Sequence, residues 1–207
     1  MPDELVFYTN PMSRGRIVRW MLEEVGTPYR TEFLDYDTTM KAPDYLAINP
    51  MGKVPSIRHG ETIVTECAAI CAYLADAFPE AGLAPAMGRR GAYYRWLFFA
   101  AGPMEAAVVN RALGFEVPPD KERMAGYGTF ENVLDTLQQA VAGNGYIASD
   151  SFSAADLYVG AHIGWGLQFG SIEARPGFAE YFERVSDRDA YRRANELDHA
   201  AMPAEPD

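Results

Sequence analysis

Cysteine and histidine are both scarce in this chain. The 207 residues include two cysteines and three histidines. Cys67 and Cys71 are four residues apart on a predicted helix, which places them on one helix face and does not suggest a disulfide framework. His59, His162 and His199 are dispersed, so no metal-ligand spacing can be recognised. We therefore expect a cytoplasmic protein with reduced thiols and no metal site.

Positive charge is also in short supply, and the chain has no long apolar run. The 18 Lys and Arg residues are outnumbered by 29 Asp and Glu residues, giving a formal net charge of -11. An acidic surface repels phosphate backbones, so we do not expect nucleic-acid binding. No apolar run approaches the length of a membrane span, and the acidic N-terminus is unlike a signal peptide. We therefore expect no membrane partner either.

The first part of the chain alternates between strand and helix patterns. Short β-prone runs are separated by turn signals, and helical spacing of apolar residues ends at Gly26 and again before Pro79. The expected elements are strands at 5–8, 28–34, 54–57 and 62–64, and helices at 13–25, 45–48 and 66–78. Their β-α-β, short helix, β-β-α order is that of a thioredoxin-like domain.

Strand signals largely vanish from Arg89 onward, which predicts an all-helical second domain. A capping box at Ser153–Asp156 marks the start of one of its helices. The other expected helices span 89–112, 121–142, 177–186 and 189–197. We predict domains at 1–82 and 89–207 joined by a linker at 83–88. The segment 198–207 has little to bury and is expected to fray.

Two short motifs point to a ligand site. Asn49–Pro55 contains a turn followed by a Val-Pro step at the start of a strand, where proline is unusual. A cis bond before Pro55 exposes the backbone N–H and C=O of Val54. Glu66-Cys67 places a carboxylate and a small residue at a predicted helix N-terminus, where free N–H groups favour a bound carboxylate. Together the motifs predict a site for an extended peptide with a free α-carboxylate.

These motifs, in this order and on this α/β plus all-α architecture, resemble the cytosolic glutathione S-transferases over essentially the whole chain. The match is to bacterial-type, theta- or beta-like members with a serine-type active site. The resemblance implies a homodimer that uses glutathione as co-substrate, without a metal, and conjugates its thiolate to small hydrophobic electrophiles. Alternatives on the same fold are a glutathione-dependent disulfide reductase or peroxidase, or a non-catalytic glutathione-binding module.

An enzyme of this family must stabilise the glutathione thiolate, and three residues are candidates for the donor. Ser13 lies where the first loop becomes a helix, and it resembles the serine of theta-like members, although it can equally be a plain N-cap. Asn10 occupies the place of the catalytic tyrosine if Arg14-Gly15-Arg16 is matched to tyrosine-type members. Tyr8 lies within a strand, which favours packing. We predict Ser13 as the donor.

The resemblance also assigns the remaining site residues. Val54 and cis-Pro55 would bind the cysteinyl backbone of glutathione. Glu66 would take the γ-glutamyl ammonium and the Cys67 N–H its carboxylate, although the family usually has Ser or Thr at the second position. Cys67 also leaves open mixed-disulfide chemistry, because a helix N-terminus lowers the pKa of a thiol. Lys41 and Lys53 are candidates for the glycyl carboxylate.

The electrophile pocket is expected between the two domains. Its predicted lining is apolar and aromatic, and consists of Met12, Tyr94, Phe98, Met104 and Trp165. The helix at 89–112 also carries more aromatic and small apolar surface than one buried stripe needs, which favours a two-fold contact with a second chain. The generic character of these residues leaves the physiological electrophile open.

Overall fold

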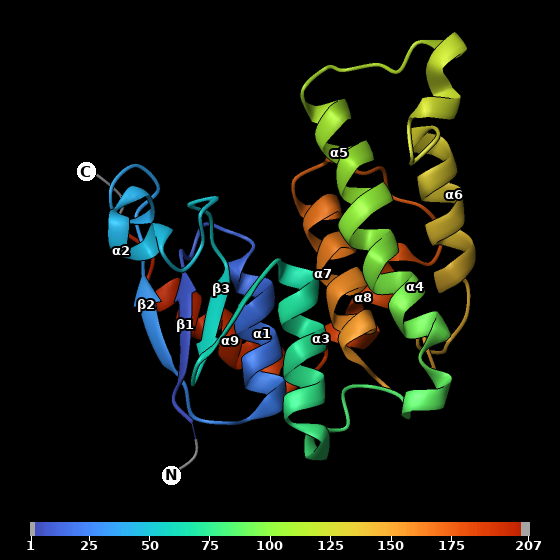
Figure 1. The fold of residues 1–207 in the computed structure, drawn as a ribbon. Helices are drawn as coiled ribbons and strands as arrows, with labels where there is room; N and C mark the ends of the chain where they lie inside the picture. The colour runs from blue at the N-terminus through green and yellow to red at the C-terminus, as the bar shows by residue number, and fades with distance from the viewer. Residues whose placement is uncertain (1–2, 204–207) are drawn as a thin grey trace. The chain divides into compact units, whose positions relative to one another are not determined.

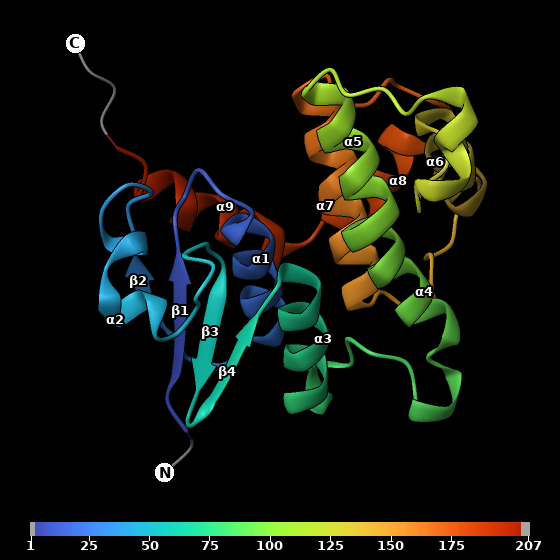
Figure 2. The same cartoon turned by 45° about the horizontal axis from the view of Figure 1, so that its top comes forward.

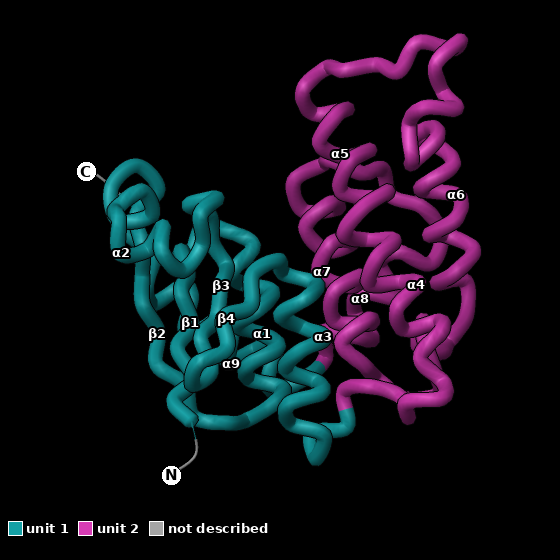
Figure 3. Tube along the Cα trace, in the orientation of Figure 1, with its two compact units in different colours: residues 1–82, 188–207 teal, residues 83–187 magenta. Residues whose placement is uncertain are grey.

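The computed structural model describes residues 3–203. The chain divides into two compact units (Figure 3), which are Met1–Gly82 with Arg188–Asp207 as unit 1 and Leu83–Asp187 as unit 2. The first break falls directly before the predicted linker at 83–88. The last segment of the chain returns to unit 1, whereas the sequence analysis placed everything after residue 88 in one domain.

Unit 1 is built on a four-stranded mixed sheet (Figure 2), in the order β2-β1-β3-β4. Strand β1 pairs in parallel with β2 and antiparallel with β3, which forms a hairpin with β4. The strands are β1 (Leu5–Thr9), β2 (Arg30–Phe33), β3 (Ser56–His59) and β4 (Thr62–Thr65). The helices within Met1–Gly82 are α1 (Gly15–Val25), α2 (Pro43–Leu46) and α3 (Cys67–Ala77). This is the thioredoxin-like order that the sequence predicts.

Alternate side chains of β1 point to opposite faces of the sheet, as expected for a strand. Val6 and Tyr8 pack in one buried cluster with Met40 and Tyr45, from the segment that contains α2. Phe7, between them, lies under the guanidinium of Arg19 from α1 at 5.1 Å. The central strand is therefore covered on both faces, which fixes the position of its C-terminal end.

Helix α9 (Asp189–Ala200) packs along α1 within unit 1. Arg19 and Asp198 form a buried ion pair at 2.8 Å, and Arg188 makes two bonds to the Glu24 carboxylate at 2.6 and 2.8 Å. The prediction that residues from 198 onward have little to bury is wrong for Asp198. Its burial follows from Arg19, a partner 179 residues away that local sequence does not reveal. Residues 204–207 of that predicted tail lie outside the described residues.

Unit 2 is helical (Figure 1). Its helices are α4 (Gly91–Phe99), α5 (Glu105–Ala112), α6 (Phe130–Val141), α7 (Ala154–Gln168) and α8 (Phe178–Ser186). Helix α7 contains the predicted capping box, in which Asp156 accepts the Ser153 N–H at 3.0 Å. None of the helices in the described part of the chain has the length and apolar character that a bilayer crossing requires.

Two predicted helices of unit 2 differ from the structure. The one expected at 89–112 is interrupted by a π-helical segment at Ala100–Met104, because Pro103 has no N–H to continue an α-helical ladder. The one expected at 121–142 starts only at Phe130. Gly128 adopts a positive φ of 68°, and the Thr129 hydroxyl caps α6 by accepting the Asn132 N–H at 3.1 Å.

Candidate functional site

Three chain segments of unit 1 meet at one end of its sheet. Ser56, the first residue of β3, pairs with Tyr8 near the end of β1 and with Thr65 at the end of β4. The residues just outside these strand ends therefore lie near one another. They are the segments 10–13, 54–55 and 66–67, which hold most of the site residues that the sequence predicts.

The loop after β1 is held by its own polar side chains. Asn10 donates through Nδ2 to the Leu34 carbonyl at 2.8 Å and accepts the Met12 N–H through Oδ1 at 2.9 Å. Ser13 Oγ donates to the Asn10 carbonyl at 2.7 Å and accepts the Gly15 N–H at 2.9 Å. Both ends of the Asn10 amide are thus engaged in shaping the loop, while Ser13 is half-buried at the start of α1.

Gly15 allows this loop to close onto α1. A Cβ at this position would overlap the Thr9 hydroxyl and come within 2.9 Å of Ser13 Oγ. A larger residue would therefore displace the Ser13 hydroxyl. The close approach explains why glycine stands between Arg14 and Arg16 in the motif.

Tyr8, the third candidate donor, lies in the sheet core. Its ring packs against Tyr45 with centroids 5.6 Å apart, and it shares a buried cluster with Val6 and Met40. Its surroundings are those of a packing residue.

The turn before β3 has the geometry that the sequence predicts, with a cis bond between Val54 and Pro55. The carbonyl of the preceding Lys53 accepts hydrogen bonds from the Tyr45 hydroxyl at 2.6 Å and from Asn49 Nδ2 at 2.8 Å. Within residues 3–203, the N–H and C=O of Val54 have no hydrogen-bond partner. Tyr45 and Asn49 thus fix the turn through Lys53, and the backbone N–H and C=O of Val54 remain available to a ligand.

Tyr45 is a site residue that sequence reasoning missed. Its buried hydroxyl also lies 3.0 Å from Ser56 Oγ, so it links the turn to the start of β3. Burial raises the pKa of Tyr45, so the phenol remains protonated at neutral pH and can donate to Lys53. The short apolar run around residue 45 gave no signal of this role, because the contact depends on how the chain folds back.

The two candidate lysines differ in their contacts. Lys41 donates to the Gly52 carbonyl at 2.7 Å, beside the cis turn. Lys53 is exposed on the turn itself. Both lysines therefore lie beside the turn that contains Val54, as a role in binding the glycyl carboxylate requires.

Glu66 has an unusual backbone conformation at the start of α3. Its φ of 65° and ψ of 118° lie in a region that side-chain-bearing residues rarely adopt. Its side chain is exposed, and within the described part of the chain its carboxylate has no hydrogen bond or ion pair. Strain of this kind, combined with an unpartnered charge, is typical of functional positions.

Cys67 links the α3 end of the site to the α1 end. It is the first residue of α3, where N–H groups have no acceptor within the helix. Cys67 is 9% exposed, and its thiol donates to the Arg14 carbonyl at 3.7 Å. The two helix N-termini therefore share one corner of unit 1, next to Ser13.

The predicted electrophile-pocket residues belong to both units. Met12 is exposed on unit 1, and Phe98 and Tyr94 are exposed on α4 of unit 2. Trp165 is half-buried on α7. Met104 is only 1% exposed and packs inside unit 2. The pocket formed by residues of both units stays a prediction.

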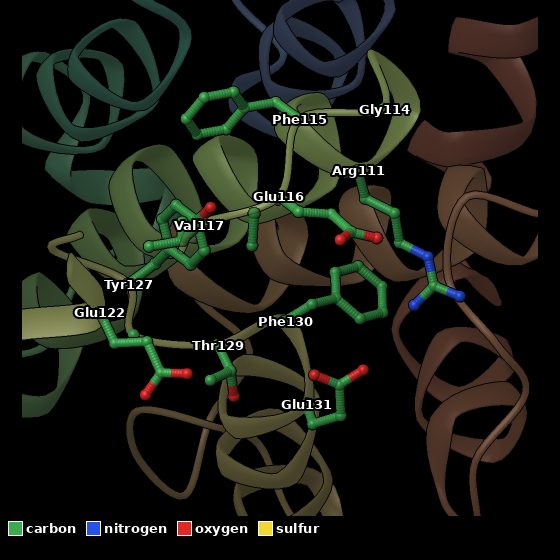
Figure 4. Close-up of a pocket in the computed structure, with 12 residues that line it drawn as sticks. Arg111, Gly114, Phe115, Glu116, Val117, Glu122, Tyr127, Thr129, Phe130 and Glu131 are labelled. Atoms are coloured by element: carbon green, nitrogen blue, oxygen red, sulfur yellow. The ribbon is translucent and has the colours of Figure 1, made fainter. Parts of the chain in front are cut away.

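Unit 2 contains a cavity of its own, of about 460 Å³, between α5, α6 and their connecting loop (Figure 4). Its walls include Phe115, Tyr127 and Phe130, with the Arg111 guanidinium 4.2 Å above the Phe130 ring. Acidic side chains, Glu116 and Glu131 among them, also line it, whereas none of the predicted pocket residues Met12, Tyr94, Phe98, Met104 and Trp165 does. Among residues 3–203, no group of three or more His, Cys, Asp or Glu side chains is arranged to hold a metal ion.

Comparison with known proteins agrees with this geometry. A family model described as "Glutathione S-transferase, N-terminal domain" matches residues 12–77, which span the loop, the cis turn and α3. "Probable glutathione S-transferase GSTF2" of Oryza sativa is 30% identical over 147 residues, covering 66% of this chain and 68% of that relative. "Glutathione S-transferase 3" of Zea mays is 27% identical over 217 residues, covering 98% of this chain and 96% of the relative.

Solved structures give the same result across both units. A glutathione transferase from Methylococcus capsulatus superposes with a TM-score of 0.77 at 26% identity, covering 95% of this chain and 99% of that one. A sphingomonad glutathione S-transferase complexed with glutathione superposes with a TM-score of 0.75 at 27% identity, covering 94% and 98%. The chain belongs to the glutathione S-transferase family. The serine-type active site stays a prediction.

Proposed function

We propose that this protein is a glutathione transferase that presents glutathione as a thiolate to small hydrophobic electrophiles. The observation that carries the proposal is the meeting of three segments at one end of the sheet: the Ser13 loop, the cis turn at Val54 and the strained Glu66 before α3. The solved sphingomonad relative, which has glutathione bound, supports the choice of ligand.

The proposed binding mode follows from the polar and charged groups at this end of the sheet. Val54 offers a free N–H and C=O to the cysteinyl backbone of an extended peptide. The Glu66 carboxylate takes the γ-glutamyl ammonium, and the Cys67 N–H at the start of α3 takes the neighbouring carboxylate. The ammonium groups of Lys41 and Lys53 bind the glycyl carboxylate. Opposite charges thus match along the length of glutathione.

The proposed chemistry depends on lowering the pKa of the glutathione thiol. A free thiol has a pKa of about 8.5, and only the thiolate attacks electrophiles well. A shift of about 2 units requires about 2.7 kcal/mol of preferential stabilisation of the anion. One hydrogen bond to a charged acceptor contributes roughly 1.5–3 kcal/mol, so the Ser13 hydroxyl can supply much of the shift.

Calorimetry with glutathione, followed by ultraviolet titration of the bound thiolate, tests this proposal. We expect binding to the wild-type protein, and Ser13→Ala should raise the thiol pKa by a unit or more with little change in affinity for the thiol form. If Asn10→Ala shifts that pKa while Ser13→Ala does not, Asn10 is the donor. Absence of glutathione binding would contradict the whole proposal.

A panel of electrophiles, disulfides and peroxides then separates the possible activities. Conjugation of electrophiles supports a transferase. Turnover of disulfides alone, lost in Cys67→Ser, would favour mixed-disulfide chemistry at the Cys67 thiol. Binding of glutathione without any turnover would favour a non-catalytic module.

We further propose a homodimer formed through α4 and α5. Tyr93 and Trp96 of α4 are buried, but Tyr94, Phe98 and Leu113 remain exposed on the same stretch of chain. Apolar surface left uncovered in this way favours a two-fold contact with a second copy. Sedimentation equilibrium should give twice the chain mass of 22.9 kDa at micromolar concentration, and a monomer mass would contradict the dimer.

A further inference from the structure

A tyrosine that the sequence analysis did not consider lies beside Ser13. Tyr36 follows β2, in a loop whose start is tied to the end of β1 by the Leu34 N–H, which donates to the Thr9 carbonyl at 2.8 Å. The Tyr36 hydroxyl donates to the Met12 carbonyl at 3.2 Å. All of these groups belong to unit 1, so their arrangement is complete within that unit.

The Ser13 proton is already in use. Its hydroxyl has one hydrogen, which it donates to the Asn10 carbonyl at 2.7 Å. To donate to a thiolate, Ser13 must give up this bond, although the Asn10 carbonyl would keep the Ser13 N–H at 3.0 Å. The thiolate bond therefore replaces an existing bond, and its net contribution is smaller than that of a hydroxyl with a free proton.

The Tyr36 proton is easier to redirect. Its bond to the Met12 carbonyl is longer than the usual O–H···O distance of about 2.7–2.8 Å, and the side chain is 44% exposed. A phenol is also a stronger acid than an aliphatic alcohol, and so donates a stronger hydrogen bond to an anion. Tyr36 can therefore turn toward a bound thiolate at little cost.

Burial keeps the Tyr36 phenol in its protonated, donor form. Burial raises the pKa of Tyr36, while the Arg14 guanidinium and the Ser13 hydroxyl act in the opposite direction without cancelling the rise. The phenol is thus protonated throughout the neutral range. Arg14 in addition places a positive charge near the Tyr36 hydroxyl.

We propose that Tyr36 is a second catalytic residue of this site, whose hydroxyl donates a hydrogen bond to the glutathione thiolate together with Ser13. The thiol proton leaves to solvent, and the phenol keeps its own proton. This inference rests on the proposed function, because it concerns the same thiolate. It assigns the tyrosine-like role to a loop after β2, away from the strand that carries Tyr8.

Ultraviolet titration of bound glutathione in four variants tests the inference. The variants are Tyr36→Phe, Ser13→Ala, the double variant, and Tyr73→Phe as a matched control. Tyr73 of α3 loses a comparable hydroxyl bond, to His59 at 3.0 Å, at the opposite end of β3 from Pro55. We expect Tyr36→Phe to raise the thiol pKa by at least half a unit, about threefold in the ionisation constant.

The remaining measurements distinguish a failure of the Tyr36 role from a failure of the proposed function. Affinity for glutathione at a pH where its thiol is protonated should be the same in Tyr36→Phe and wild type, and the double variant should show a larger pKa rise than either single variant. An unchanged pKa in Tyr36→Phe, with a raised pKa in Ser13→Ala, would overturn the Tyr36 role and leave the proposed function standing. Wild-type protein that does not bind glutathione would overturn both.

Discussion

Two carboxylates at helix N-termini, one in each unit, have opposite surroundings. Asp156 in the first turn of α7 is fully buried and accepts hydrogen bonds from the Ile147 N–H, the Ser153 N–H and hydroxyl, and the Tyr181 hydroxyl, at 2.7–3.0 Å. Glu66 at the start of α3 is exposed, strained and without a protein partner in the described residues.

The difference separates a structural carboxylate from one suited to a ligand. The bonds from Ile147 and Tyr181 join α7 to neighbouring segments, and the two from Ser153 cap the helix, so all of the hydrogen bonds that Asp156 accepts stabilise the fold. Burial raises the pKa of Asp156, and the four hydrogen bonds act against that rise. Within residues 3–203 the Glu66 carboxylate makes no hydrogen bond or ion pair, and its backbone strain must be offset elsewhere. A charge held in this way is available for binding.

The largest expected effect is on stability, when the buried Asp156 carboxylate is removed. Asp156→Ala leaves the buried N–H groups of Ile147 and Ser153 and the Tyr181 hydroxyl without an acceptor. Because each unsatisfied buried group costs about 1–3 kcal/mol, we expect a loss of about 3–5 kcal/mol in the free energy of unfolding. Chemical denaturation followed by circular dichroism measures it.

Asp150→Ala is the matched control, because Asp150 lies in the same loop but is exposed. It should change the free energy of unfolding by less than about 0.5 kcal/mol. Equal stability losses in the two variants would show that the Asp156 bonds do not hold the start of α7.

The sequence predicted the capping box that contains Asp156, but it did not predict the contacts of Tyr36 and Tyr45. The difference lies in how far apart the bonded residues are in the chain. A capping box is a local pattern, since Ser153 and Asp156 are three residues apart and both bond within one helical turn. Tyr45 reaches Lys53 only through a folded-back turn, and Tyr36 reaches Met12 across 24 residues. Such contacts depend on strand register, which single-sequence patterns do not define.

The thioredoxin-like order, the cis bond before Pro55 and the placing of Glu66 at the start of a helix were predictable for the same reason. Each follows from neighbouring residues: turn signals, a Val-Pro step, and a carboxylate before an apolar run. The division of the chain into units was only partly readable. Helix α9 belongs to unit 1 because Arg19 and Asp198 pair across most of the chain, and neither residue signals this by itself.

Removing the Glu66 carboxylate should weaken glutathione binding. Glu66→Ala removes a charged hydrogen bond to the proposed γ-glutamyl ammonium, worth roughly 1.5–3 kcal/mol, so the dissociation constant for glutathione should rise tenfold or more. Isothermal titration calorimetry measures it. Glu61→Ala, an exposed carboxylate in the β3–β4 turn, is the control and should bind as wild type does. Equal affinity in Glu66→Ala and wild type would rule out the assigned contact.

The smallest expected effect concerns the strain itself. Glycine adopts a φ near 65° without a steric penalty, so Glu66→Gly should relieve about 1–3 kcal/mol of backbone strain and lose about 0.5–1 kcal/mol through the greater freedom of the unfolded chain. We expect a net gain of about 1 kcal/mol in the free energy of unfolding, together with weakened glutathione binding. Glu61→Gly, at a position without a positive φ, should be destabilised instead. If both glycine variants lose stability to the same extent in urea denaturation, Glu66 is not strained in solution, and the comparison with Asp156 would rest on hydrogen bonding alone.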